Sequence, residues 1–139
     1  MVWEKKDIID YIYNSKSLVL ATVAEDKTPQ LRSIGGYGVE EYNIYFATAK
    51  DSDKVAQIAG NPNVVLLFQQ EGQQVPKNVT LYGKAEALEG EAYKKAIEII
   101  KKRRPQLPLN EDKVVYHIKP EKIKVLDFTV TPPVQVVEL

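Results

Sequence analysis

The chain has 139 residues, of which 44% are hydrophobic, and this size and apolar content suit one domain with one core. Its 19 basic side chains balance 19 acidic ones, so net charge favours neither nucleic acid nor an anionic membrane. The lack of cysteine excludes disulfides, thiol catalysis and sulfur-ligated zinc, and the single histidine, His117, cannot form a histidine-rich metal site. We see no signal peptide or membrane-spanning run, and we expect a cytoplasmic protein.

The first half of the chain changes from helical to strand patterns and back. Residues 4–14 carry isoleucines at helical spacing, which predicts a short amphipathic helix. Aliphatic and β-branched runs separated by polar turns then predict a meander of three strands. These expected strands are 17–24, 29–39 and 42–49. A second helix of about two turns is predicted within 50–62, where Ser52 or Asp51 can act as cap and Pro62 prevents continuation.

The second half adds four strands and one further helix. The expected strands are 63–70, 78–88, 113–119 and 122–130, the last two separated by Pro120. The run 63–70 is almost continuously apolar, which indicates burial on both faces, whereas 78–88 alternates and indicates one wet face. Residues 91–104 predict a helix that Pro105 ends. Because strands follow one another without regular helical crossovers, we predict a mainly antiparallel β-barrel with two or three helices packed outside.

The segment FATAKDSDK, residues 46–54, has the pattern of an anion site. A strand ends, a helix begins, and Thr48, Ser52 and Lys54 supply two hydroxyls and an ammonium beside the exposed N–H groups of the helix start. This chemistry suits a phosphate monoester. The same residues are also compatible with an ordinary capped helix and a solvated lysine.

Arg32 strengthens the phosphate interpretation because it lies in the middle of an expected strand, beside Leu31 and Ile34. An unpaired guanidinium is costly to bury, so it should face a ligand or a carboxylate. The glycines that follow, Gly35, Gly36 and Gly38, indicate a bulge, a close approach of backbone to another group, or simply the end of the strand.

Three ordered motifs carry a family resemblance: LVLATVAEDKTPQLRSI, IYFATAKDSDKVAQIAGNPNVVLLF and VTLYGKAEAL. Together they resemble the pyridoxamine 5'-phosphate oxidase-like family of FMN-binding split barrels, across roughly residues 8–130. The resemblance implies that residues 1–139 form a single antiparallel split-barrel domain. It also implies a homodimer with two FMN sites at its interface, each built from both chains.

The resemblance further implies three kinds of contact with FMN. The phosphate ligands would be Arg32, Ser52 and Lys54. The residues along the ribityl chain and the isoalloxazine ring would be Ser33, Ile34, Ala47 and Thr48. Asn78, at the start of its strand, matches the position that contributes an amide from the partner chain.

Two departures from the family pattern limit what is carried over. Asp53 stands where many relatives have an arginine, and its charge should weaken phosphate binding unless it points away, pairs with a cation or is offset by Lys50. The C-terminal segment TVTPPVQVVEL lacks the tryptophan and arginines of true pyridoxamine-phosphate oxidases, so vitamin B6 oxidation is not expected. The only tryptophan, Trp3, could pack on the barrel or lie across a flavin, and we expect packing.

We therefore expect an FMN-binding flavoprotein, an oxidoreductase with an unidentified small-molecule substrate and a reduced nicotinamide as possible electron donor. No side chain is identified as a catalytic acid or base, and no metal site is expected. One alternative is a flavin-binding protein without catalysis, of the general-stress type. Another is the use of deazaflavin F420 or haem, although His117 is expected to be structural or to lie on the surface.

Overall fold

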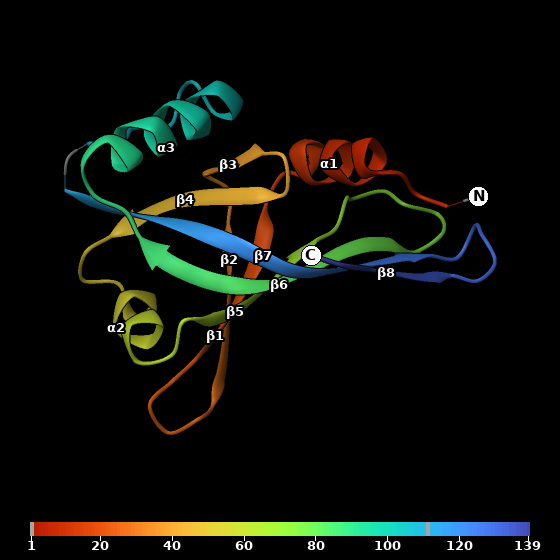
Figure 1. Ribbon diagram of the computed structural model, residues 1–139, viewed down its shortest axis with the longest axis horizontal. Coiled ribbons are helices and arrows are strands. Elements are labelled where there is room, and N and C mark those ends of the chain that lie inside the picture. The colour runs from red at the N-terminus through yellow and green to blue at the C-terminus, as the bar shows by residue number, and fades with distance from the viewer. Residues whose placement is uncertain (1, 111) are drawn as a thin grey trace.

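The protein is described by a computed structural model that covers residues 2–110 and 112–139 (Figure 1). Within these residues it has three helices and eight strands. The helices are α1 (Lys5–Asn14), α2 (Asp53–Gly60) and α3 (Gly90–Arg103). The strands are β1 (Leu18–Val23), β2 (Pro29–Ile34), β3 (Tyr37–Glu40), β4 (Asn43–Ala49), β5 (Asn63–Phe68), β6 (Lys77–Ala87), β7 (Lys113–Asp127) and β8 (Val134–Glu138). No helix in these ranges has the length and apolar character needed to cross a membrane.

All strands belong to one antiparallel sheet with the order β2-β1-β5-β6-β7-β4-β3. The long strand β7 divides the sheet, because its first half pairs with β4 and its second half pairs with β8, while β6 runs along its other side. Figure 1 shows α1 and α3 on one side of the curved sheet and α2 on the opposite side. The predicted architecture, an antiparallel split barrel with helices outside, is confirmed.

Alternation of side chains along the strands builds the core. Leu18 and Leu20 in β1 and Leu66 and Phe68 in β5 are fully buried, and Phe46 meets them from β4. A smaller apolar cluster lies between α3 and the outer face of β4 and β7. Each helix therefore covers a face of the sheet that would otherwise expose apolar side chains.

Two of the expected strand boundaries are wrong. The run 29–39 is two strands, because β2 ends at Ile34 and the chain bends through Gly35 and Gly36 before β3. Pro120, by contrast, does not divide the strand it occupies. It lies at a bulge where the register between β6 and β7 shifts, and a bulge tolerates a residue that cannot donate a backbone hydrogen bond.

The apolar run in β5 is buried on one face only. Val64, Leu66 and Phe68 point into the core, whereas Val65 and Leu67 are half-exposed on the outer face. The prediction of burial on both faces is therefore wrong for a single chain.

Arg103, at the end of α3, links α3 by hydrogen bonds to the end of α1 and to the β2–β3 bend. Its guanidinium donates hydrogen bonds to the carbonyl oxygens of Tyr13 in the last turn of α1 and of the C-cap residue Ser15. It also donates to those of Gly35 and Tyr37 around the β2–β3 bend. It also lies 3.6 Å from the ring centre of Tyr37. The last turn of α1 has no basic residue of its own, so a cation from α3 complements its carbonyl end.

Gly38 allows β3 and α3 to touch through their backbones. A Cβ atom there would lie 2.7 Å from the backbone nitrogen of Ile100. We therefore expect Gly38→Ala to lower the free energy of unfolding by about 1–3 kcal/mol, as overpacking does, measured by denaturant titration. Gly60→Ala is the matched control, because nothing lies within 4 Å of the added atom, and it should change stability by less than about 0.5 kcal/mol. Equal stability of the two variants would contradict this close approach.

Candidate functional site

The start of α2 brings three polar side chains together. The ammonium of Lys54 donates to the hydroxyl of Thr48 at 2.7 Å and to that of Ser52 at 2.6 Å. Ser52 is the N-cap residue but makes no side-chain capping bond, so its hydroxyl faces Lys54 instead. Thr48, near the end of β4, is buried. The lysine is therefore drawn back over the strand end rather than extended into solvent.

Arg32 approaches the same helix from β2. Its Nη1 donates to the Thr22 hydroxyl at 2.6 Å, and its Nη2 donates to Oε1 of Gln57 at 2.8 Å. Longer bonds of 3.3 Å reach the carbonyl oxygens of Leu20 and Gln30. Every one of these acceptors is an uncharged oxygen, so the positive charge of Arg32 is solvated by the protein but not neutralised.

The two cations affect each other. Neither Arg32 nor Lys54 forms an ion pair with a carboxylate in the described part of the chain. Burial, and then the nearby charge of Arg32, lower the pKa of Lys54. Burial also lowers the pKa of Arg32. Two partly buried cations that form no ion pair favour an anion between or beside them.

Asp53 stands next to this pair without joining it. Its carboxylate is exposed and makes no ion pair, yet its charge raises the pKa of both Arg32 and Lys54. The aspartate therefore lies near enough to oppose a bound anion but does not occupy the position of one.

The other expected site residues on β2 and β4 lie next to this cluster along their strands. Ser33 is exposed on the outer face of the sheet, while Ile34 packs against the core. Beyond them, Gly35 and Gly36 line a cavity of about 640 Å³ together with Arg103 and Arg104. Gly35 follows Arg32 by three residues of extended chain, about 10 Å. Ala47 faces the cluster beneath α3, on the opposite side of β4 from Thr48.

Asn78 lies apart from the other expected site residues. It begins β6, three strands away from β2 and thus about 14 Å across the sheet. Its neighbours along β6, Thr80 and Tyr82, share its outward face. Within one chain Asn78 does not reach the Arg32 cluster, so its expected role on the other chain of a dimer stays a prediction.

Two residues of the cluster were not anticipated from the sequence. Thr22 is fully buried in β1 and donates its hydroxyl proton to Oε1 of Gln57 at 2.5 Å. Gln57 follows Lys54 by three residues in α2 and so lies on the same helix face. This three-residue spacing from Lys54 is the sequence feature that could have indicated Gln57 as a member of the cluster. Thr22 could have been noticed because it places a hydroxyl at an inward-facing position of an otherwise apolar strand.

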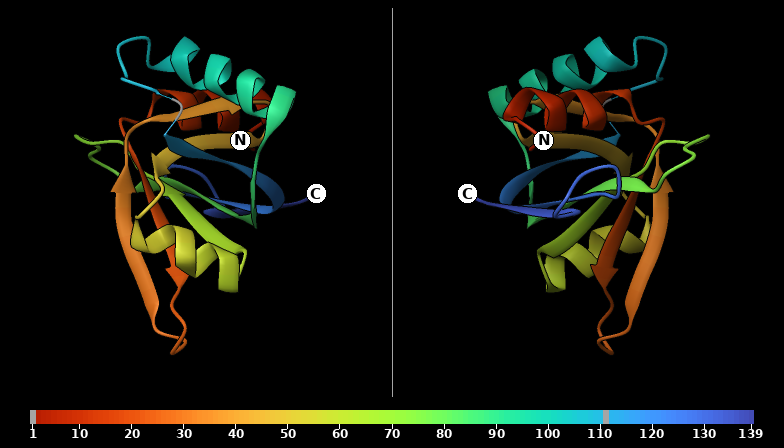
Figure 2. Two further views of the ribbon diagram at one scale, coloured as in Figure 1. Left: turned by 90° about the vertical axis from the view of Figure 1, so that its left-hand side faces the viewer. Right: turned by 90° about the vertical axis from the view of Figure 1, so that its right-hand side faces the viewer.

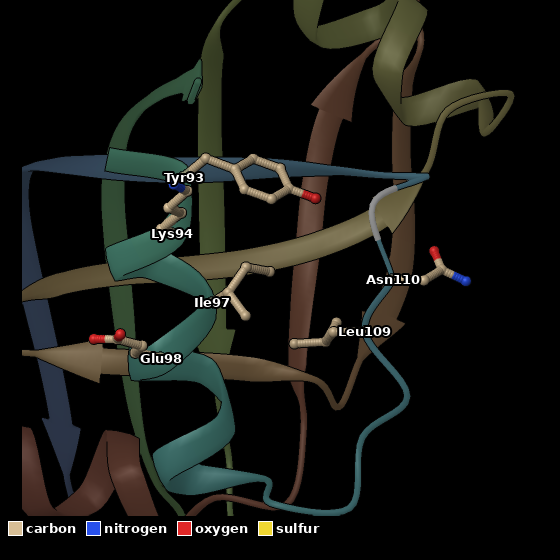
Figure 3. Close-up of a pocket in the computed structure, with 6 residues that line it drawn as sticks. All are labelled: Tyr93, Lys94, Ile97, Glu98, Leu109 and Asn110. Atoms are coloured by element: carbon tan, nitrogen blue, oxygen red, sulfur yellow. The ribbon is translucent and has the colours of Figure 1, made fainter. Parts of the chain in front are cut away.

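A separate hollow lies along α3. Figure 3 shows Ile97 and Leu109 facing each other across it, with Tyr93 at one end. Its volume is about 360 Å³, and its apolar floor adjoins the cluster that contains Ala47. This hollow lacks the paired cations of the α2 site and does not suit a phosphate.

Trp3 and His117 are both held by the fold. The indole Nε1 of Trp3 donates to Oδ2 of Asp127 at 2.7 Å, which confirms its packing role. His117 stacks on Tyr45 with ring centres 5.0 Å apart. Its Nε2 lies 2.7 Å from the Asn43 side-chain oxygen, and its Nδ1 lies 3.1 Å from a Glu86 carboxylate oxygen. Both ring nitrogens therefore have protein partners, and His117 is structural, as expected.

Comparisons with known proteins agree with the fold. Residues 5–127 match the family model described as pyridoxamine 5'-phosphate oxidase. A pyridoxine/pyridoxamine 5'-phosphate oxidase of Burkholderia thailandensis is 36% identical over 67 residues, which are 48% of this chain and 31% of that protein. The chain therefore matches about a third of the length of this curated relative.

Two solved structures are similar over nearly the whole chain. General Stress Protein 26 from Bacillus anthracis is 25% identical, with a TM-score of 0.74 and coverage of 97% of this chain and 98% of that one. A heme binding protein from Mycobacterium smegmatis has a TM-score of 0.79, covering 99% of this chain and 59% of that one. At 15% identity, the second similarity shows the fold alone.

Asp53→Asn tests whether the cluster is an anion site. Unit charges about 4 Å apart in water interact by about 1 kcal/mol, so removing this negative charge should tighten phosphate binding by up to roughly fivefold. The measurement is the rise in melting temperature caused by inorganic phosphate, relative to chloride at equal ionic strength. Asp51→Asn, at another exposed residue of the same turn, is the control and should leave the rise unchanged. An equal rise in both variants would argue against the site.

Proposed function

Because the chain belongs to the pyridoxamine 5'-phosphate oxidase family, we propose that residues 1–139 form a single FMN-binding domain that acts as an oxidoreductase on a small molecule. The observation that carries the proposal is the pair of uncompensated cations, Arg32 and Lys54, beside the start of α2. A phosphate monoester carries the charge, and the acceptor oxygens, that this pair requires.

The polar groups at the start of α2 fit the phosphate end of FMN. Lys54 supplies a point charge and Arg32 supplies guanidinium donors. The hydroxyls of Thr48 and Ser52 accept from Lys54 and so keep their own O–H groups as donors to an anion. The exposed N–H groups of the first turn of α2 add a favourable dipole. Asp53 opposes the same charge, so we expect FMN to be held with modest affinity.

The extended part of FMN would follow β2. Ser33 and Ile34 would offer backbone groups along it, and the end of β4 at Ala47 and Thr48 would border it. The cavity at Gly35 and Gly36 lies in the same direction and provides room for a reacting partner near the ring. When bound, the flavin would supply the redox chemistry, with a reduced nicotinamide as possible donor, and the protein would fix its orientation and limit access of water.

A homodimer would complete the site. Leu31 is 70% exposed, and it lies in one row of the outer sheet face with Ala21, Val65 and Tyr82. Such a contiguous apolar face is typical of a protein interface. Asn78 projects from the same face, so a second copy packed there would bring this amide towards the other chain's flavin.

FMN is favoured over haem because the only histidine, His117, already uses both ring nitrogens in contacts with other side chains. Both nitrogens of His117 already contact Asn43 and Glu86, and using either one as an axial ligand would break a hydrogen bond. Oxidation of pyridoxamine phosphate itself is not proposed, because the C-terminal strand β8 has no arginine and Trp3 is bonded to Asp127.

We expect the purified protein to quench flavin fluorescence when FMN is added, and Arg32→Ala and Lys54→Ala each to weaken binding roughly tenfold or more, since each loses a charge-assisted contact. Lys6→Ala, an exposed lysine of α1, should bind as the wild type does. Unchanged affinity in both site variants would remove the phosphate assignment.

Parallel titrations separate the other functions. Binding of haem without binding of FMN would overturn the cofactor proposal. Oxidation of NADH or NADPH by the FMN-loaded protein would support an oxidoreductase, whereas a bound flavin that neither nucleotide reduces would favour a flavin-binding protein without catalysis.

Leu31→Arg tests the dimer. The residue is largely exposed in a single chain, so the substitution should leave the fold intact but place a charge in the apolar interface. We expect the mass measured by light scattering at micromolar concentration to fall from that of a dimer to that of a monomer. Val2→Arg, at a residue 69% exposed, is the control and should remain dimeric. A monomeric wild type would contradict the interface.

A further inference from the structure

The contacts of Arg32 form a closed ring with Thr22 and Gln57. Nη1 and Nη2 of Arg32 donate to the Thr22 hydroxyl oxygen and to Oε1 of Gln57, and the Thr22 hydroxyl donates to the same Oε1. Two oxygens thus meet the two terminal nitrogens of a guanidinium, as the oxygens of a carboxylate do in a bidentate pair. Here both oxygens are uncharged.

This arrangement determines which N–H groups of Arg32 remain free to bind a ligand. Nη1 is surrounded by three acceptors, and Nη2 has one. In the described residues Nε and the second N–H of Nη2 have no partner, and these two donors lie on one edge of the guanidinium plane. That edge has the spacing to bind two oxygens of one phosphate group.

Gln57 also connects the two cations. Lys54 and Gln57 lie one turn apart on α2, so the helix that carries the ammonium also carries the oxygen that orients the guanidinium. The third member, Thr22, is fully buried and cannot exchange its bonds for water. The separation and orientation of the two positive charges are therefore fixed by the packing of α2 on β1.

We propose that Thr22 and Gln57 are positioning residues, which act together as an uncharged substitute for a carboxylate: they hold Arg32 in the orientation that binds a phosphate while leaving its charge available. This inference rests on the proposed function, because the phosphate is that of FMN. The residues need not touch the ligand. Their effect is on the charge and direction of Arg32.

Gln57→Glu is the critical variant because it keeps the shape of the side chain and adds one negative charge. The new carboxylate would pair with Arg32, which should maintain or raise the melting temperature. The same pairing neutralises the cation, so FMN should bind roughly tenfold more weakly or worse. Riboflavin, which lacks the phosphate, should bind the variant and the wild type equally. A purely structural role for Gln57 would change both ligands together.

Two further variants keep the test decisive if Q57E folds poorly. Gln57→Met and Thr22→Val remove the oxygens without adding charge, and each should weaken FMN by roughly threefold to tenfold while riboflavin binding is retained. Equal FMN affinity in all folded variants and in the wild type would overturn the positioning role. A wild type that binds riboflavin and FMN equally, or neither, would instead refute the phosphate site of the proposed function.

Discussion

Two positive charges, on Arg32 and Lys54, are held close together by neutral oxygens, and the rest of the candidate site depends on this constraint. No carboxylate in the described part of the chain forms an ion pair with either cation, and the exposed Asp53 offsets their repulsion only in part. Such an arrangement costs stability in the unliganded protein. The two cations are held in place because the buried side chain of Ile58 fixes α2 on the sheet and because Thr22 is fully buried in β1. An anion bound beside the two cations would lower their mutual repulsion.

The sheet organises the other elements around this pair of charges. The edge strand β2 carries Arg32 towards α2 at one end and leads to the bend at Gly35 and Gly36 at the other. Figure 2 shows the β1–β2 hairpin extending alongside α2, so the cation cluster lies where hairpin and helix meet. The outer face of the same sheet is apolar around Leu31. One sheet therefore presents the candidate anion site and an exposed apolar face within a few residues of each other.

Much of the fold follows directly from the pattern of side chains. The alternation in β6 and the apolar stripe of α3 each depend on the local period, and both elements are found where they were expected. The break after Ile34 and the continuity of β7 through Pro120 depend instead on distant partners. Leu107 packs at Gly36, and β6 supplies the bulge that accepts Pro120. Local patterns contain no information about such contacts.

The site residues likewise divide into those that the local sequence predicts and those that depend on distant contacts. Thr48, Ser52 and Lys54 are close in sequence and their proximity could be inferred, whereas the role of Thr22 requires knowing that β1 lies between β2 and α2. Within a single chain Asn78 lies apart from the Arg32 cluster, and its contact with a ligand of a second copy stays a prediction. FMN binding at these residues stays a prediction.

The bonds of Arg103 make the end of the first helix depend on a residue far along the chain. Its partner in α1, Tyr13, precedes it by 90 residues, so the carbonyl end of the first helix gains its cation only after most of the chain has been made. Closing a loop of this length costs conformational entropy that a contact within the helix does not. The carbonyl end of α1 is therefore complemented by a cation only in a chain that extends to residue 103.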